Sequence, residues 1–99
     1  MAVTAVIKFT TQPGKREDLI TFLSGVQEAA IGAGCHSISV HRDLADENGV
    51  FEIESWDAQD NHEAFVKAAA DAGAFAPLDD ILAGPFAVSY GEVAKRTDA

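Results

Sequence analysis

The order in which two hydrophobic periods alternate along the chain constrains the fold more than any other feature. Over residues 2–10 apolar side chains occupy every second position, the period of a half-buried strand. Over residues 15–31 they recur at spacings of three and four, the period of an amphipathic helix. Alternation returns over residues 37–43 and 50–56, and a polar turn between these segments predicts a hairpin.

The second half of the chain continues the same pattern. Asp57 is expected to cap an alanine-rich helix over residues 58–72, and Gly73 interrupts it. A shorter helical segment is predicted over residues 75–82, and a last strand over residues 86–93. The order βαββαβ is typical of a ferredoxin-like α+β fold with a four-stranded antiparallel sheet and helices on one face.

The chain is expected to form one domain. Its 99 residues are enough for a single hydrophobic core and too few for two. We place this core in residues 2–94 and expect a flexible tail over residues 95–99.

One face of such a sheet carries no helices. From strand parity we expect this face to hold a mixed set of side chains: Val6, Lys8, Ser37, Ser39, His41, Glu52, Glu54 and Trp56. Parity does not decide whether they meet water or a second subunit. Two roles are open for Glu54: to orient a base, or to pair with Arg42 or Lys8 across the sheet, and we favour the pair. If a second subunit buries Glu54, it requires such a partner.

The charge of the chain excludes several kinds of partner. Sixteen acidic residues against seven basic ones give a formal net charge of −9, which repels phosphate backbones and anionic lipid headgroups. Nucleic-acid and membrane partners are therefore not expected. The start of the chain lacks the pattern of a signal peptide and no apolar run is long enough to span a bilayer, so we expect a cytoplasmic protein.

No residue pattern indicates a cofactor or a metal. Cys35 is the only cysteine, so it cannot form an internal disulfide, and we interpret it as a small buried hydrophobic residue. The sequence lacks the Cys/His spacing of a zinc site, and its scattered glycines fit no dinucleotide or phosphate-binding motif.

Three segments of the chain resemble the antibiotic biosynthesis monooxygenase family. They are residues 34–43, the strand Phe51-Glu52-Ile53-Glu54-Ser55-Trp56, and the helix opening Asp57-Ala58-Gln59-Asp60. The glutamate and tryptophan that end the third strand are the most specific part. The resemblance implies a dimeric α+β barrel, in which the sheets of two subunits pack face to face. It also implies oxidation of a small aromatic, phenolic or quinol-like molecule by dioxygen, with no flavin, metal or haem.

Two positions, one in the second predicted helix and one after it, differ from this family. Many relatives have a histidine about three turns into that helix, often with another histidine further on, whereas this chain has Phe65 and Ala74 there. His62 lies one turn earlier. Haem degradation, which requires an axial histidine in related proteins, is therefore not expected.

The implied oxidation requires a base, a hydrogen-bond donor for the developing oxyanion, and an apolar cavity that excludes water. His62 is our first candidate for the base or for a substrate anchor, because it is the only ionisable group on a helical stripe with Phe65, Val66 and Ala69. Tyr90 is the candidate donor. The alternatives are a buried histidine bonded to backbone and a tyrosine that only packs.

Four aromatic residues are expected to line a substrate cavity: Trp56, Phe65, Phe22 and Phe86. The alternative role for Trp56 is packing, either in the core or between subunits.

Three functions remain open at this point. The first is a cofactor-independent monooxygenase. The second is a non-catalytic ligand-binding or regulatory dimer, which the absence of the family histidine favours. The third is another enzyme on the same scaffold, such as an isomerase or a cyclase, since one fold supports many chemistries.

Overall fold

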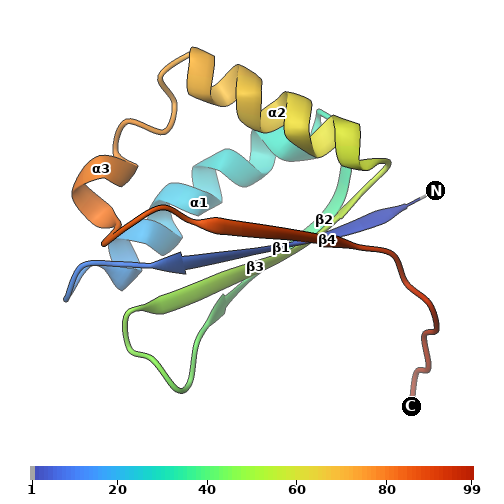
Figure 1. Ribbon diagram of the computed structural model, residues 1–99, viewed down its shortest axis with the longest axis horizontal. Coiled ribbons are helices and arrows are strands. Elements are labelled where there is room, and N and C mark those ends of the chain that lie inside the picture. Colours follow the sequence, from blue (N-terminus) through green and yellow to red (C-terminus); the bar gives the residue numbers. More distant parts are fainter. Residues whose placement is uncertain (1) are drawn as a thin grey trace.

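The computed structural model describes residues 2–99 and has the predicted order of elements. The strands and helices are β1 (Val3–Thr10), α1 (Arg16–Ile31), β2 (Cys35–Arg42), β3 (Gly49–Trp56), α2 (Gln59–Asp71), α3 (Leu78–Ile81) and β4 (Ala87–Gly91). Figure 1 shows the helices together on one side of the sheet. The ferredoxin-like α+β prediction is therefore confirmed.

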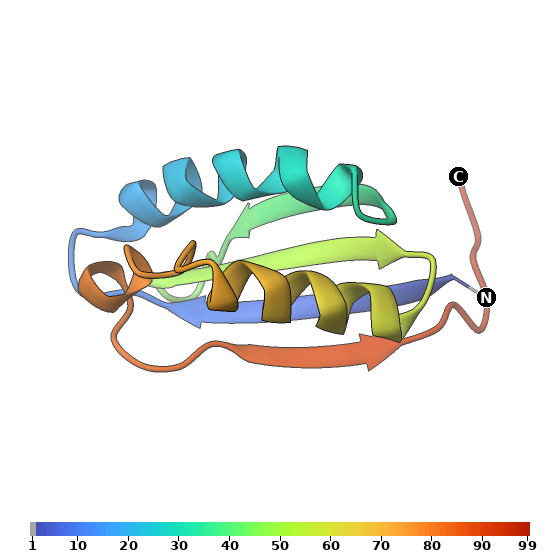
Figure 2. The same ribbon diagram turned by 90° about the horizontal axis from the view of Figure 1, so that it is seen from above.

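The sheet has the strand order β2-β3-β1-β4, and every neighbouring pair is antiparallel. Seen from above, α1 lies over the β2 side of the sheet and α2 over its β1 side (Figure 2). The two long helices pack on the sheet and hardly touch each other. The core between helices and sheet contains buried residues from both strands and helices, among them Ala5, Ile7, Phe9, Leu19, Leu23, Ala30, Val50, Trp56, Leu78 and Ile81.

The register of β1 and β3 determines which residues face the helices. Ala5 lies opposite Glu54, and Ile7 lies opposite Glu52. Directly opposed residues of an antiparallel pair share a face, so both glutamates join the buried residues of β1. Glu52, Glu54 and Trp56 are 6%, 6% and 0% exposed.

The prediction that these three residues lie on the uncovered face was wrong. Alternation along β3 separates the strand into two sets of side chains, and both sets mix polar with apolar residues. The sequence of one strand therefore does not show which set is inside. The expected pairing of Glu54 with Arg42 or Lys8 is also wrong, since Arg42 forms its ion pair with Glu17 of α1, at 2.6 Å between Nη2 and Oε1.

The uncovered face carries the other set from each strand. Val6 lies opposite Ile53, and Lys8 opposite Phe51. The His41 ring stacks on Phe51, with ring centroids 4.9 Å apart and planes 9° apart. The predicted placement of Val6, Lys8, Ser37, Ser39 and His41 on this face is confirmed by the strand pairing.

The start of α2 differs from the prediction. The helix begins at Gln59, and Ala58 precedes it without a side-chain cap. The carboxylate of Asp57 instead lies 2.5 Å from His36 Nε2, at the start of β2. Asp57 therefore joins the segment after β3 to β2 rather than capping the helix. Among the described residues no helix is long and apolar enough to cross a bilayer.

Candidate active site

His62 of α2 occupies a gap in the buried face of the sheet. Its side chain is 4% exposed and reaches the two cross-strand neighbours of Ala5, which are Glu54 on β3 and Tyr90 on β4. Ala5 has the smallest side chain among the core residues of β1. The missing bulk at this position leaves room for an imidazole between a carboxyl group and a phenol.

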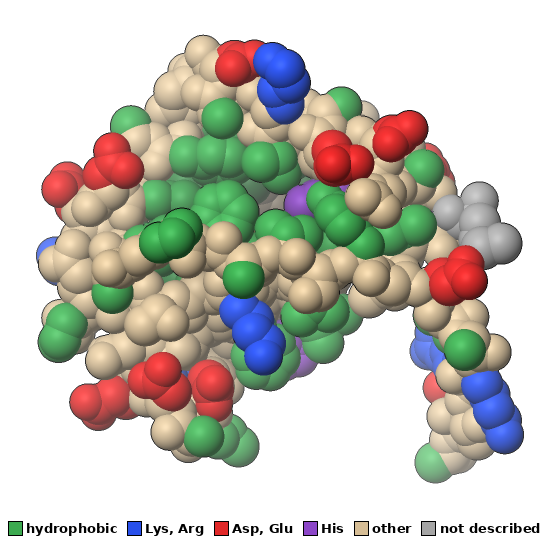
Figure 3. Space-filling model, viewed as in Figure 1, with side chains coloured by type: hydrophobic (Ala, Val, Ile, Leu, Met, Phe, Trp, Pro, Cys, Tyr) green, Lys and Arg blue, Asp and Glu red, His purple; other side chains and the backbone are tan. Residues whose placement is uncertain are grey.

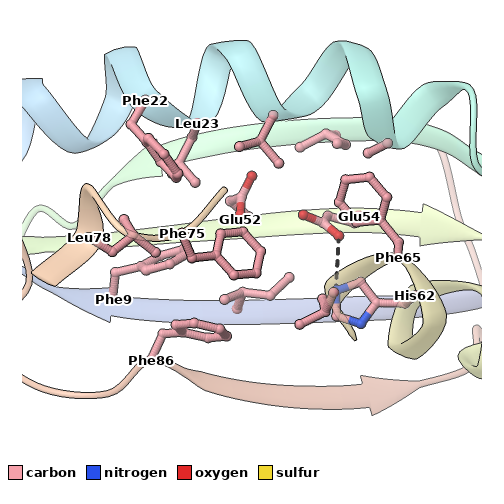
Figure 4. A pocket seen from close by; sticks show the side chains of 15 residues that line it. Phe9, Phe22, Leu23, Glu52, Glu54, His62, Phe65, Phe75, Leu78 and Phe86 are labelled. Carbon is pink, nitrogen blue, oxygen red and sulfur yellow. Dashed lines mark ion pairs between the residues drawn. The ribbon is translucent and has the colours of Figure 1, made fainter. Parts of the chain in front are cut away.

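The two ring nitrogens of His62 have different partners. Nδ1 lies 2.5 Å from the Tyr90 hydroxyl. Nε2 lies 3.6 Å from Glu54 Oε1, the pair joined by the dashed line in Figure 4. Burial lowers the pKa of His62, so the imidazole is neutral at pH 7. A neutral ring has one N–H and one lone pair. The lone pair is satisfied when the Tyr90 hydroxyl donates to Nδ1, and the Nε2–H then faces Glu54 at a separation too long for a hydrogen bond.

Two carboxyl groups lie side by side next to this histidine. Burial, the charge of Glu54 and a hydrogen bond to it raise the pKa of Glu52 to about 8. Glu52 is therefore a neutral acid at pH 7 that donates to Glu54. Burial also raises the pKa of Glu54, against hydrogen bonds from Trp56 and Glu52 that lower it. The Trp56 Nε1–H donates to Glu54 Oε1 at 2.8 Å. A proton donor and a proton acceptor thus stand next to each other on one strand.

The two carboxyl groups and His62 line an otherwise apolar cavity of about 40 Å³. Five phenylalanines from both long helices, β1 and the α3 region contribute to its wall: Phe9, Phe22, Phe65, Phe75 and Phe86. Figure 4 shows these rings around the space into which Glu52 and Glu54 point. Hydrophobic side chains also gather in a hollow between α2 and the edge of the sheet (Figure 3). Such a wall excludes water and strengthens electrostatic interactions within the site.

The structure brings most of the predicted site residues together. His62, Phe22, Phe65 and Phe86 line the cavity. Tyr90 and Trp56 lie just outside its wall and bond to His62 and Glu54. The Trp56 ring packs against His62 and Phe65, with centroids 5.1 and 5.6 Å away.

The paired carboxyl groups of Glu52 and Glu54 were not predicted from the sequence to be part of a site. The signal was the position of Trp56, which shares its parity along β3 with Glu52 and Glu54. Tryptophan is highly buried on average, so its parity favoured the inner set, although only the pairing of β3 with β1 decides which set is inside.

The single cysteine of the chain, Cys35, is not part of this site. The Cys35 thiol is 4% exposed and lies 3.4 Å from the Ser37 carbonyl oxygen. Burial and the charge of Glu54 raise its pKa, so it remains a thiol at pH 7. Across residues 2–99 no three His, Cys, Asp or Glu side chains are arranged to hold a metal ion.

Comparison with known families finds one match. Residues 2–75 match the family described as antibiotic biosynthesis monooxygenase. The matched segment includes β1, β3 and α2, and thus Glu52, Glu54 and His62. No curated protein matches the sequence.

Solved structures share the fold over nearly the whole chain. A candidate antibiotic biosynthesis monooxygenase from Bordetella bronchiseptica is 20% identical, with a TM-score of 0.84, and the match covers 95% of this chain and 98% of that one. Rv0793 from Mycobacterium tuberculosis is 15% identical, with a TM-score of 0.79 and coverage of 99% and 100%. A mutant form of SnoaB, a cofactor-independent oxygenase from Streptomyces nogalater, is 14% identical, with a TM-score of 0.78 and coverage of 96% and 95%.

Proposed function

Since the chain belongs to the antibiotic biosynthesis monooxygenase family, we propose that it oxidises a phenolic or quinol-like molecule with dioxygen and without a cofactor. The observation that carries this proposal is the buried pair Glu52 and Glu54 at the polar end of an aromatic cavity. The pair supplies a base and a hydrogen-bond donor, and the phenylalanines exclude water. Similarity in fold to SnoaB, described as a cofactor-independent oxygenase, supports the same chemistry.

Glu54 is the proposed base, in place of the role expected for His62. His62 Nδ1 is taken up by the Tyr90 hydroxyl and Nε2 lies 3.6 Å from Glu54, whereas Glu54 lines the cavity and accepts a hydrogen bond from the neutral Glu52. His62 and Tyr90 are then positioning residues: Tyr90 fixes the tautomer, and the Nε2–H stabilises the Glu54 carboxylate. When the substrate binds, the O–H of neutral Glu52 turns from Glu54 to the substrate oxygen that becomes negative.

The reaction balances for a ring CH₂ group activated by a phenol or ketone. Glu54 removes one proton, and the resulting carbanion gives one electron to dioxygen. The radical and superoxide combine into a C–O bond, which makes a peroxide. Loss of the second carbon-bound proton breaks the O–O bond, so that CH₂ and O₂ become C=O and H₂O. One oxygen atom enters the product and the other enters water.

Oxygen uptake by metal-free protein with a panel of hydroquinones and anthrone-like phenols tests the proposal. We expect one O₂ consumed per product and a rate at least about 100-fold lower in Glu54→Gln, the usual minimum for a lost general base. The matched control is Glu63→Gln, at an exposed position of α2. Absence of uptake by the wild-type protein across the panel would contradict the proposal.

A second candidate is an isomerase that moves a proton within the substrate and needs no dioxygen. The neutral Glu52 and the adjacent Glu54, which accepts hydrogen bonds from Trp56 and Glu52, favour it, because a keto–enol shift requires one acid and one base close together. The two candidates differ in one simple respect. An isomerase works at the same rate under argon, and an oxygenase stops.

We also propose that the active form is a homodimer joined through the uncovered face of the sheet. Val6, Phe51 and Ile53 form an apolar centre on this face, and Ile53 is 41% exposed. A groove of about 320 Å³ lined by these residues and Lys8 runs beside them. Packing against a second copy removes this surface from water, which stabilises association in proportion to the apolar area buried.

A further inference from the structure

We infer that the substrate site continues from the cavity into a groove between α1 and α2, and that it takes a neutral molecule with a hydroxyl or carbonyl head and an extended apolar body. This inference rests on the proposed function, since it concerns the same site, and it specifies the class of substrate.

The cavity alone is too small for an aromatic substrate. Its volume of about 40 Å³ holds about three water molecules. A benzene ring occupies a protein cavity of about 150 Å³. A substrate therefore has to extend beyond the space that Glu52 and Glu54 line.

A larger apolar groove begins on the other side of the cavity wall. It has a volume of about 550 Å³, within the usual range for small-molecule sites. Small residues line it on both helices, namely Gly25 and Ala29 on α1 and Ala68 and Ala69 on α2. Because α1 and α2 pack on the sheet and hardly on each other, the space between them stays open.

Four side chains belong to the walls of both spaces: Phe22, Val26, Phe65 and Phe75. They form the partition between the cavity and the groove. Rotation of the phenylalanine rings joins the two into one elongated site. Its polar end is at Glu52 and Glu54, and its apolar end is between the helices.

The charges around this site select a neutral head. No Lys or Arg lines the cavity or the groove, and the only acidic groups there are the paired carboxyls of Glu52 and Glu54, of which Glu52 keeps its proton at pH 7 because its pKa is raised to about 8. An anionic head would meet like charge without a cation to pair with it. A cationic head would find Glu54 already bonded by Trp56 and Glu52. A hydroxyl group can donate to Glu54, and a hydroxyl or carbonyl oxygen can accept from Glu52.

The hollow near α3 is a less suitable continuation. It has a volume of about 350 Å³ and shares Phe75, Leu78 and Phe86 with the cavity. Its outer wall, however, consists of Asp79 and the segment 83–85. An apolar body gains more by burial between the helices, where every lining side chain is apolar.

Calorimetric titration with para-alkylphenols from ethyl to heptyl tests the inference on the full chain. We expect affinity to rise about fourfold with each methylene buried. Ala69→Phe fills the groove and should abolish this rise, so that para-heptylphenol binds this variant no more tightly than para-ethylphenol does. The control Ala70→Phe, on the same helix but outside the groove, should keep the rise. Octanoate and octylammonium should bind at least about tenfold more weakly than para-heptylphenol.

Three results would overturn the inference. The first is an affinity that does not depend on alkyl chain length, and the second is an equal loss of the rise in both phenylalanine variants. The third is tighter binding of octanoate or octylammonium than of para-heptylphenol. Binding is measured without turnover, so failure of the proposed function is a separate result. If alkylphenols bind with the expected dependence and no hydroquinone consumes oxygen, the site stands and the oxygenase does not.

Discussion

At the scale of single residues, Ala5 is what makes the site possible. A larger side chain at this position of β1 would occupy the space of the imidazole between Glu54 and Tyr90. Ala5→Leu is therefore expected to lower the free energy of unfolding by about 1–3 kcal/mol, as overpacked cores do. It should also break the contact of His62 with Tyr90. Urea denaturation and the NMR shifts of the His62 ring measure the two effects.

The control for Ala5→Leu is Ala87→Leu, at an exposed position of β4. This change adds the same atoms to the sheet outside the core. A loss of stability equal in the two variants would show that the gap at Ala5 has no special role.

The pair Glu52 and Glu54 makes stability fall as pH rises from 7 to 8. In the unfolded chain Glu52 ionises near its ordinary value of 4.5, whereas the folded protein keeps its proton up to about pH 8 because its pKa is raised. Between these values the folded state binds more protons, so the free energy of unfolding decreases with pH. The lowered pKa of His62 acts in the opposite direction, but only at or below its ordinary value of 6.5. Above pH 7 the raised pKa of Glu52 therefore sets the direction of the dependence.

Glu52→Gln removes this dependence. The amide has the shape of the neutral acid and does not titrate, so thermal denaturation of the variant should give a flat profile between pH 7 and 8. Its melting temperature should exceed that of the wild type at pH 8. Glu63→Gln, an exposed change on α2, should keep the wild-type slope. An unchanged slope in Glu52→Gln would disprove the assignment.

The sequence indicated the candidate site residues whose side-chain types are rare in the chain. His62 is the only histidine on an apolar helical stripe, and Tyr90 is the only tyrosine. Glu52 and Glu54 were not indicated in this way, because acidic residues are numerous and mostly exposed. Their place in the cavity wall depends on the register of β3 with β1, which brings Ala5 and Ile7 opposite them.

At the scale of elements, periodicity predicted every strand and helix, since it reflects which side chains are buried on each. The ends were less accurate: β4 ends at Gly91, before the predicted residue 93, and α3 covers only Leu78–Ile81. Which face of β3 is inside could not be predicted from that strand, because the decision lies in the pairing with another strand.

The turn between α1 and β2 depends on Gly34. Its φ is +105°, and an added Cβ would lie 3.1 Å from Asn61 Nδ2. Gly34→Ala should therefore lower the free energy of unfolding by about 1–2 kcal/mol. Gly25→Ala, within α1 and with open space around it, should raise it by about 0.5–1 kcal/mol. Thermal denaturation of both variants measures the difference, and a change of the same sign in both would contradict this reasoning.

At the scale of the whole molecule, the homodimer is tested by mass. Sedimentation at low micromolar concentration should give twice the chain mass of 10.4 kDa, and Ile53→Asp should reduce it to one chain. Leu44→Asp, in the fully exposed hairpin turn, is the control and should stay dimeric. A wild-type protein that sediments at one chain mass would reject the dimer. Glu54 and Trp56, for which burial by a second subunit was one of the alternatives, are already buried within one chain.

The neutral Glu52 also changes the charge that the folded molecule carries. The formal net charge of −9 counts every carboxyl group as ionised, so the folded protein at pH 7 is one unit less negative. Unfolding at this pH releases that proton to the solvent. The calorimetric enthalpy of unfolding will therefore depend on the ionisation enthalpy of the buffer that takes up the proton, although the melting temperature will not.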